Sequence, residues 1–236
     1  MYFTINAQGI LNIKTKPKLA ESIFMASNLT LEKVRFVIGG KALILVRPKR
    51  LEEIFQGNPF LEVEKFPLWF KVWEASLILS DYLSRVHPIK DILELGAGLG
   101  IPSLVASTFG HRVLATDYED LPLSFVQKSA QLNNLSVNVK KLDWLSPQLD
   151  KSFDLIVGAE IIYKETFFEP LINLFKTYLK EEGEVILSHS SERVRVLIPF
   201  LNEAQREFDV KTSIRRLKGD NGEVFEIILN RLILKS

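Results

Sequence analysis

The fold is decided by the stretch Asp91-Ile92-Leu93-Glu94-Leu95-Gly96-Ala97-Gly98-Leu99-Gly100-Ile101-Pro102. Its apolar start predicts a buried strand, its three glycines at every second position predict a turn, and its proline predicts the first turn of a helix. A glycine turn lets the backbone come into van der Waals contact with a ligand, beside the N–H groups of a helix start. We therefore expect a nucleotide-like cofactor at this turn.

The spacing of the glycines narrows the choice of cofactor. A dinucleotide site has the pattern G-x-G-x-x-G, but its third glycine is replaced by Ile101 when counted from Gly96 and by Ser103 when counted from Gly98. Glu94 stands two residues before the first glycine, where its charge would repel a pyrophosphate and attract a cation. S-adenosylmethionine carries an ammonium and a sulfonium group and no phosphate. The motif therefore favours S-adenosylmethionine over NAD or FAD.

An acid follows the next predicted strand. Asp117 ends the strand over 112–116 and lies seventeen residues beyond Gly100. At the carboxyl end of a neighbouring parallel strand, an acid can accept hydrogen bonds from two ribose hydroxyls. Capping of the following helix is the alternative role, and the distance from the glycine turn favours the ribose. We place the next residue, Tyr118, in the same expected cofactor site.

Composition limits the class of protein. The chain has 236 residues, 47% hydrophobic and 25% charged, with a net charge of +1, which is typical of one α/β domain and not of a nucleic-acid binder. It has no cysteine, so disulfides and thiolate metal sites are excluded. Its three histidines are scattered, and we expect no metal. It has no apolar run long enough for a membrane and no leader pattern, so we expect a cytoplasmic monomer that does not bind membranes.

Strands and helices alternate after residue 70, which is typical of a parallel sheet covered on both faces. Helices are predicted over 68–85, 101–109, 121–133, 166–179 and 192–208, and strands over 89–95, 112–116, 137–142, 153–158 and 183–188. Two more strands, over 210–217 and 223–229, flank a tight turn and must be antiparallel. The expected fold class is α/β, with a Rossmann-like seven-stranded mostly parallel sheet that ends in an antiparallel C-terminal hairpin.

The pattern differs before residue 60. Two apolar segments, 34–38 and 41–46, flank Gly39-Gly40 and predict a β-hairpin. No linker rich in glycine, proline or serine follows it. We therefore expect a single domain over 1–236, with an N-terminal β-hairpin extension over 1–60 and a Rossmann-like catalytic core over 61–236.

Several motifs occur together in one order. They are Val72-Trp73-Glu74-Ala75, the glycine turn, Ala115-Thr116-Asp117, Leu142-Asp143-Trp144 and the stretch from Phe153 to Tyr163. In this combination the chain resembles the seven-β-strand (class I) S-adenosylmethionine-dependent protein lysine methyltransferases of the Asp-x-x-Tyr motif group, methyltransferase-like family 16. One position differs, because the aspartate of that motif is Glu160 here, which keeps the charge and extends it by one methylene.

The resemblance implies a set of cofactor contacts. It places Trp73 and the glycine turn at the methionine end, Asp117 at the ribose, Trp144 near the adenine and Ala159 beside the methyl group. From residue type alone, Trp73 can equally be a core residue and Trp144 a cover over the sheet edge. The expected cofactor residues are Trp73, Glu94, Gly96, Ala97, Gly98, Gly100, Asp117, Tyr118, Asp143, Trp144 and Ala159.

Glu160 and Tyr163 are the expected catalytic residues. A lysine ammonium has a pKa of about 10.4, so about one molecule in a few thousand is neutral and nucleophilic at pH 7. A carboxylate would draw the ammonium in, and a neighbouring sulfonium in a partly dry pocket would lower the pKa of the amine. Tyr163 would orient the nitrogen through its hydroxyl or its ring. The alternative is a loop acid and a packing aromatic.

The sequence therefore predicts an S-adenosylmethionine-dependent methyltransferase that modifies a lysine side chain of a cytoplasmic protein. Two alternatives stay open. One is a methyltransferase for small-molecule amines, and the other is a catalytically silent module that binds S-adenosylmethionine and a partner.

Overall fold

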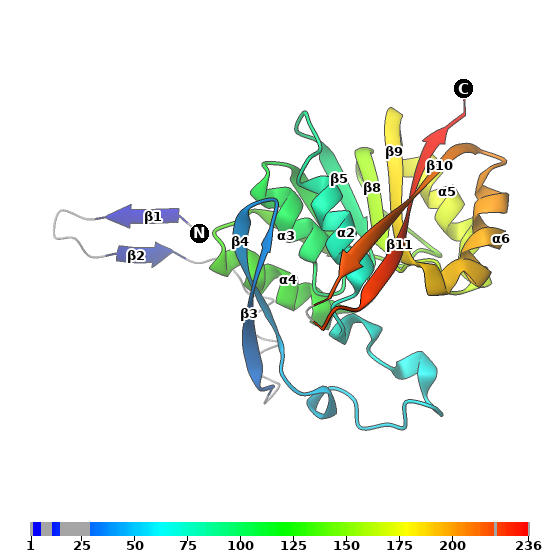
Figure 1. Ribbon diagram of the computed structural model, residues 1–236. Helices are drawn as coiled ribbons and strands as arrows, with labels where there is room; N and C mark the ends of the chain where they lie inside the picture. Colours follow the sequence, from blue (N-terminus) through cyan, green and yellow to red (C-terminus); the bar gives the residue numbers. More distant parts are fainter. Residues whose placement is uncertain (1, 6–10, 15–28, 220, 236) are drawn as a thin grey trace.

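The computed structural model describes residues 2–5, 11–14, 29–219 and 221–235. Its centre is a seven-stranded sheet with the order β10-β11-β9-β8-β5-β6-β7 (Figure 1). The parallel strands are β5 (Asp91–Leu95), β6 (Arg112–Asp117), β7 (Val137–Lys141), β8 (Phe153–Ala159) and β9 (Leu179–Ser190). The antiparallel hairpin is β10 (Phe208–Lys218) and β11 (Val224–Leu234). The predicted fold class is confirmed.

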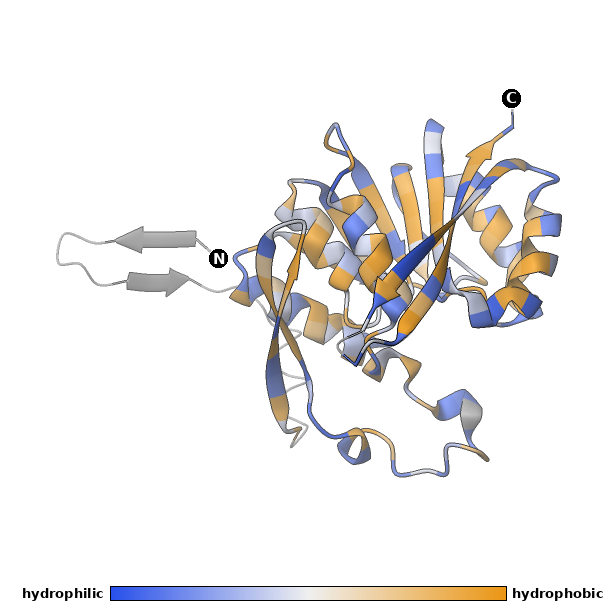
Figure 2. Cartoon of the chain, in the orientation of Figure 1, coloured by the Kyte–Doolittle hydropathy of each residue, from blue (hydrophilic) through white to orange (hydrophobic). Residues whose placement is uncertain are grey.

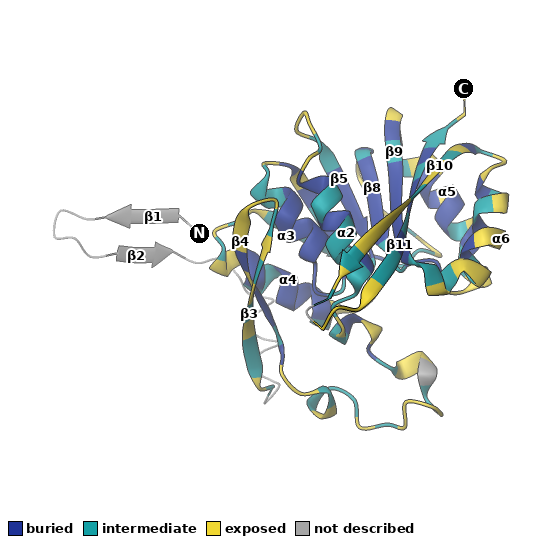
Figure 3. Cartoon of the chain, viewed as in Figure 1, coloured by how far each residue is buried: buried dark blue, intermediate teal, exposed yellow. Residues whose placement is uncertain are grey.

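Helices cover both faces of the sheet, and the alternation of side chains along each strand explains how. The helices are α2 (Glu74–Leu83), α3 (Ile101–Thr108) and α4 (Asp120–Leu132), and then α5 (Phe168–Tyr178) and α6 (Val194–Ala204). Ile92 of β5 lies in one core cluster with Leu79 of α2, whereas the next residue, Leu93, lies in another with Phe175 of α5. Figures 2 and 3 show β5, β8 and the middle of β9 as mainly apolar and buried between these helices.

Three predicted helices are too long, because short 3-10 helices precede the regular ones. The helix predicted over 68–85 splits into η3 (Leu68–Phe70) and α2, since Lys71 and Trp73 have extended backbone between them. In the same way η4 (Glu165–Phe167) precedes α5 and η5 (Ser191–Arg193) precedes α6. The helix predicted over 192–208 ends at Ala204, because Phe208 is fully buried as the first residue of β10. Chain breaks of this kind depend on tertiary contacts and carry no clear local pattern.

The predicted N-terminal hairpin is confirmed as β3 (Leu31–Ile38) and β4 (Lys41–Pro48), joined by Gly39 and Gly40 in left-handed conformation. It packs on α3 and α4. The open edge of β4 is bonded to α4: Ile44 N–H donates to Asn133 Oδ1 at 2.8 Å, and Val46 N–H donates to Ser129 Oγ at 2.9 Å. These bonds satisfy backbone groups that an edge strand would otherwise leave unpaired.

The extension also contains a strand pair that the sequence pattern did not predict. Strands β1 (Tyr2–Ile5) and β2 (Leu11–Lys14) pair antiparallel. The remaining residues of the extension before residue 29, namely 1, 6–10 and 15–28, lie outside the described part of the chain. Within the described part, no helix has the length and apolar character needed to cross a membrane.

The segment between β4 and α2 runs below the sheet in Figure 1, at the edge where the parallel strands end. It contains η1 (Leu51–Glu53), η2 (Val63–Lys65) and η3. A hydrogen bond of 2.8 Å from Lys164 Nζ to Glu64 Oε1 ties η2 to the loop after β8. The segment therefore borders the same edge as the predicted site.

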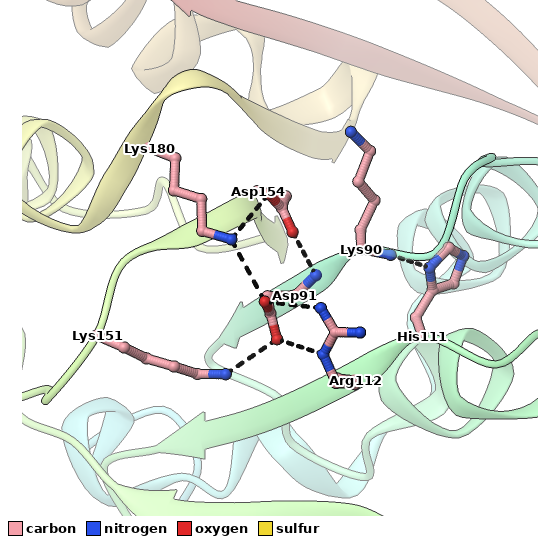
Figure 4. A network of polar contacts seen from close by, with 7 residues as sticks. All are labelled: Lys90, Asp91, His111, Arg112, Lys151, Asp154 and Lys180. Carbon is pink, nitrogen blue, oxygen red and sulfur yellow. Dashed lines mark hydrogen bonds and ion pairs between the residues drawn. The ribbon is translucent and has the colours of Figure 1, made fainter.

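An ionic network joins the opposite ends of the strands (Figure 4). Asp91, the first residue of β5, accepts hydrogen bonds from Arg112 Nε at 2.8 Å and Nη2 at 2.9 Å, from Lys151 at 3.0 Å and from Lys180 at 3.3 Å. Asp154 accepts from the Asp91 N–H at 2.6 Å and from Lys180 at 2.9 Å. The Arg112 guanidinium, with the two lysines, holds the pKa of the Asp91 carboxyl well below its usual range. The network thus fixes the starts of neighbouring strands.

Replacing Asp91 with Asn should lower the free energy of unfolding at pH 7 by about 1–2 kcal/mol, because the lysines and the arginine lose their shared acceptor. Since the folded pKa of Asp91 is depressed, its stabilisation is present above the unfolded pKa of about 4 and is lost as the pH falls below it. The difference between wild type and D91N should therefore narrow in urea unfolding below pH 4.

The control for this prediction is Asp120→Asn. Asp120 is half exposed and pairs with the exposed Lys141 at 3.2 Å, so its loss should change stability little. Equal stability of D91N and wild type at pH 7 would contradict the role given to the network.

Candidate functional site

The sheet order brings the predicted site residues to one edge. Strands β8, β5, β6 and β7 are consecutive neighbours, and their carboxyl ends lie side by side. The glycine turn follows β5, Asp117 ends β6, Asp143 and Trp144 follow β7, and Ala159 ends β8. Parallel sheets bind ligands in the crevice outside such strand ends. The topology therefore assembles residues that are more than sixty residues apart in the chain.

Glycine is required in this turn by the left-handed backbone conformation and by the neighbouring side chains. Gly96, Gly98 and Gly100 have φ values of 59°, 52° and 70°. A Cβ on Gly96 would lie 3.0 Å from Ile161 Cγ2 and 3.4 Å from Trp144 Cζ2, whereas one on Gly100 would lie 2.6 Å from Val126 Cγ2. Gly96 thus lets the backbone pass close to Ile161 and beside the indole. Gly100 lets α4 pack against the start of α3.

Asp117 is bonded directly to the glycine turn. Its Oδ2 accepts the Gly98 N–H at 2.8 Å, and its Oδ1 accepts the Glu119 N–H at 3.1 Å. Burial raises the pKa of the Asp117 carboxyl. Each oxygen keeps a second lone pair, which is what a ribose diol would need. The neighbouring Tyr118 is exposed, and its ring lies 5.8 Å from the Nζ of Lys141.

Glu94 lies beneath the turn and not on its surface. Its side chain is buried and accepts the N–H of Ser103 at 3.0 Å, and also the hydroxyl of Ser103. The N–H group of Ser103 at the start of α3 is therefore occupied, which corrects the expectation that helix-start N–H groups point freely at a ligand. Burial raises the pKa of the Glu94 carboxyl to about 8.

Trp69 is a residue of the site region that the sequence analysis missed. A Cβ on Gly98 would lie 3.4 Å from Trp69 Cβ, so η3 covers the turn. The buried indole stacks 5.9 Å from Phe125 and donates from Nε1 to Glu119 Oε2 at 3.2 Å. The indole lay inside a predicted continuous helix, and only the break before α2 shows its separate role.

An aromatic cluster lines the β7 and β8 ends of the edge. Trp144 lies 6.4 Å from Tyr163 and 5.3 Å from Phe167 between ring centroids, and Tyr163 lies 5.5 Å from Phe167. Phe167 was not predicted. Asp143 accepts a backbone N–H two residues further on at 2.9 Å, so its carboxylate shapes the loop that presents Trp144. Partial burial raises the pKa of the Tyr163 hydroxyl.

The side chain of Glu160 reaches the end of β9. The residue has a left-handed backbone with φ of 58°, which is strained for a residue other than glycine. Its Oε1 accepts the Ser190 N–H at 2.6 Å, and its Oε2 lies 3.4 Å from Arg193 Nε. The side chain is 7% exposed, and Oε2 is buried without a hydrogen bond. Burial raises the pKa of this carboxyl.

His189 holds the loop that carries both predicted catalytic residues. Its Nε2 accepts the Ile162 N–H at 3.1 Å, between Glu160 and Tyr163 in sequence. The imidazole is fully buried, and burial lowers its pKa to about 3, so it is neutral at physiological pH. A neutral ring with Nε2 as acceptor is what this contact requires. His189 therefore acts as a structural anchor of the loop.

Arg193 contacts both the ring of Trp73 and the carboxylate of Glu160. Trp73 precedes α2 and donates from Nε1 to the carbonyl of Leu68 at 2.9 Å. Its ring lies 4.6 Å from Lys71 Nζ and 6.0 Å from Arg193 Cζ. The region thus combines an indole, a buried carboxylate and cations. The indole and the carboxylate are contacted by cations of the chain itself, Lys71 and Arg193.

These residues fit S-adenosylmethionine better than a phosphate-bearing cofactor. The N–H of Ser103 at the helix start is taken by Glu94, the carboxylate of Asp117 is bonded to the glycine turn, and an indole packs on the turn. Carboxyl groups beneath and beside the turn suit a ligand that carries positive charge. The buried Glu160 Oε2 adds an acceptor that lacks a donor.

Comparisons with known proteins point the same way. A family model described as lysine methyltransferase matches residues 68–208. Protein N-lysine methyltransferase METTL21A from Xenopus tropicalis is 33% identical over 148 residues, which cover 59% of this chain and 68% of the relative. Histone-arginine methyltransferase METTL23 from Rattus norvegicus is 33% identical over 116 residues, covering 43% and 49%. The matches thus span about half to two thirds of these curated relatives.

A solved structure supports the fold alone. Ribosomal protein L11 methylase from Lactobacillus delbrueckii subsp. bulgaricus aligns with a TM-score of 0.55 and 23% identity, covering 70% of this chain and 81% of that one.

Replacing Glu94 with Gln should make the free energy of unfolding less dependent on pH. The folded pKa of Glu94 is raised above its ordinary value, so unfolding releases a proton between about pH 4.5 and 8, and the wild type loses stability as the pH rises through that window. At about 1.4 kcal/mol per pH unit, this loss is on the order of a few kcal/mol. Gln keeps an acceptor for Ser103 and has no proton to lose.

Urea unfolding at pH 5 and pH 8 measures this difference. Glu181→Gln is the control, because Glu181 is an exposed acid away from the turn. An equal change of stability in wild type and E94Q would show that Glu94 does not titrate in this window.

Proposed function

The chain belongs to the family of lysine methyltransferases, and from that premise we propose that it transfers a methyl group from S-adenosylmethionine to a lysine side chain of a cytoplasmic protein. The reaction class and the cofactor follow from the family. The acceptor is the proposal. The observation that carries it is the buried Oε2 of Glu160, a carboxylate oxygen without a hydrogen-bond donor at the end of β8.

The cofactor roles follow the order of the strand ends. We assign the ribose to Asp117, the adenine to Trp144, the methionine end to Trp73 and the glycine turn, and the neighbourhood of the methyl group to Ala159. When bound, S-adenosylmethionine supplies an electrophilic methyl group for in-line displacement at sulfur. The chain contributes position, because Asp117 is fixed by the Gly98 N–H and the glycine turn passes beside the indole of Trp144.

Glu160 is suited to receive the acceptor nitrogen. A buried acceptor without a partner destabilises the protein by about 1–3 kcal/mol, and an incoming N–H removes that penalty. The direction of Oε2 is fixed, because Ser190 holds Oε1 and the strained backbone holds the residue. A lysine nitrogen that donates to Oε2 is therefore oriented before reaction.

The aromatic cluster at the ends of β7 and β8 is suited to contact the methylene groups of a lysine side chain. Trp144, Tyr163 and Phe167 present ring faces and edges beside the strand ends. Such a surface packs methylene groups and excludes water, and a drier pocket lowers the pKa of an amine. We assign to Tyr163, which is 39% exposed, the contact with the substrate side chain.

A protein substrate is favoured over a free amine by the surroundings of the site. Large apolar side chains are exposed on the segments that border the strand ends, and exposed apolar surface marks docking sites for partners. They are Phe60 at 90%, Leu61 at 83%, Leu145 at 64% and Leu68 at 42%. A small amine would not need this surface.

Glu160→Gln should reduce methyl transfer about tenfold to a hundredfold, since a hydrogen bond to a charged group contributes about 1.5–3 kcal/mol. The assay is transfer of label from methyl-labelled S-adenosylmethionine to proteins of a desalted cell extract. Affinity for S-adenosylmethionine, measured by calorimetry, should stay within about twofold. The exposed Glu165→Gln is the matched control and should be fully active. Wild-type activity in E160Q would refute the assigned acceptor site.

Replacing Phe60 and Leu61 with Ser should raise the KM for the protein acceptor. Loss of two docking side chains, each worth up to about 1.5–3 kcal/mol when buried, predicts an increase of at least tenfold without a change in affinity for S-adenosylmethionine. Ile89→Ser, 56% exposed and just before the start of β5, is the control. A KM within twofold of wild type would leave this segment without a part in docking.

A further inference from the structure

Arg193 is the cation that faces Glu160. It ends η5, and its side chain is 35% exposed. Its Nε lies 3.4 Å from Glu160 Oε2, close enough for an ion pair, yet Oε2 accepts no hydrogen bond. Its Cζ lies 6.0 Å from the ring of Trp73. Arg193 therefore balances the charge of Glu160 while leaving a lone pair of Oε2 free.

A carboxylate without a neighbouring cation would keep the lysine amine protonated and so hinder methyl transfer. Two opposite unit charges 4 Å apart interact by about 4 kcal/mol near a protein surface, which raises the pKa of an amine by about three units. A carboxylate that attracts a lysine ammonium therefore also holds its proton. Only the neutral amine is a nucleophile. The site needs an acceptor for the N–H that does not stabilise the ammonium.

We propose that Arg193 neutralises Glu160, so that the carboxylate orients the acceptor amine without holding its proton. The inference rests on the proposed function, and Arg193 acts in it as a positioning residue through Glu160. The ammonium proton passes to water. The nitrogen lone pair then forms the N–C bond as the C–S bond breaks, and the sulfur keeps the electron pair of that bond.

The effects of the other charged groups on the pKa of Glu160 largely cancel. Glu74 and Lys71, at the approach to α2, act on the pKa of Glu160 in opposite directions and pair with each other at 3.3 Å. His189 of β9 is buried and neutral, and Tyr163 titrates above its ordinary range. Arg193 is thus the charge whose removal changes the balance at the site.

The first test needs no acceptor. The carboxyl carbon of Glu160 is titrated by NMR in the full chain, with its signal assigned by its absence in E160Q. Arg193→Gln should raise the midpoint by about one pH unit, because an opposite charge at this range lowers the pKa of an acid by at least that much. Arg193→Lys should stay near wild type, and Arg195→Gln, an exposed arginine on the next helix, is the control.

The second test is the pH dependence of kcat, which reports groups in the enzyme–substrate complex. The assay uses the protein that is labelled by methyl-labelled S-adenosylmethionine in an extract. In R193Q the midpoint of the rise of kcat with pH should shift to higher pH by about one unit. At high pH the activity should approach that of the wild type. The double variant E160Q/R193Q restores a neutral site, so its rise should return to the wild-type position at a lower maximum.

The outcomes separate this inference from the proposed function. An unmoved Glu160 midpoint, or a loss of kcat in R193Q that is equal at every pH, would show that Arg193 serves only the packing of η5 and would overturn the inference. Full activity of E160Q would instead overturn the proposed acceptor site itself.

Discussion

Parallel pairing of β5 with β6 and β8 determines where every loop of the candidate site lies. It aligns the carboxyl ends of the strands, so that residues from four separate loops share one edge. The Asp91 network holds the starts of the strands, and the hydrogen bond from Gly98 to Asp117 holds their ends. Between these two ends, helices bury both faces of the sheet. The site is therefore positioned by the ends of a sheet that is buried on both faces.

Much of this was predictable from local patterns. The apolar strands, the glycine turn and the two hairpins each have a signature within about twelve residues, and the fold followed from their order. The break before α2 was not predictable, because Trp69 is held by contacts with Gly98 and Glu119. The same holds for Glu160, whose partners Ser190 and Arg193 lie about thirty residues further along the chain. Motifs name such residues, but only tertiary packing gives their partners.

Throughout the site, burial disfavours the charged form of acidic side chains. Glu94, Asp117 and Glu160 are acids whose pKa values are raised by burial, which is unfavourable for stability at neutral pH. Strained backbone at Glu160 adds to this. A protein retains such features where they serve a ligand, and a ligand that brings positive charge would relieve them. The pattern agrees with a cationic cofactor and an amine acceptor at one edge.

The chemical identity of the methylated residue shows whether the acceptor is a lysine. The purified chain is incubated with methyl-labelled S-adenosylmethionine and a desalted extract, and the labelled protein is hydrolysed to its amino acids. We expect methyl-lysine from a discrete protein band. Methyl-arginine, or label confined to small molecules while S-adenosylmethionine binding is intact, would contradict this expectation.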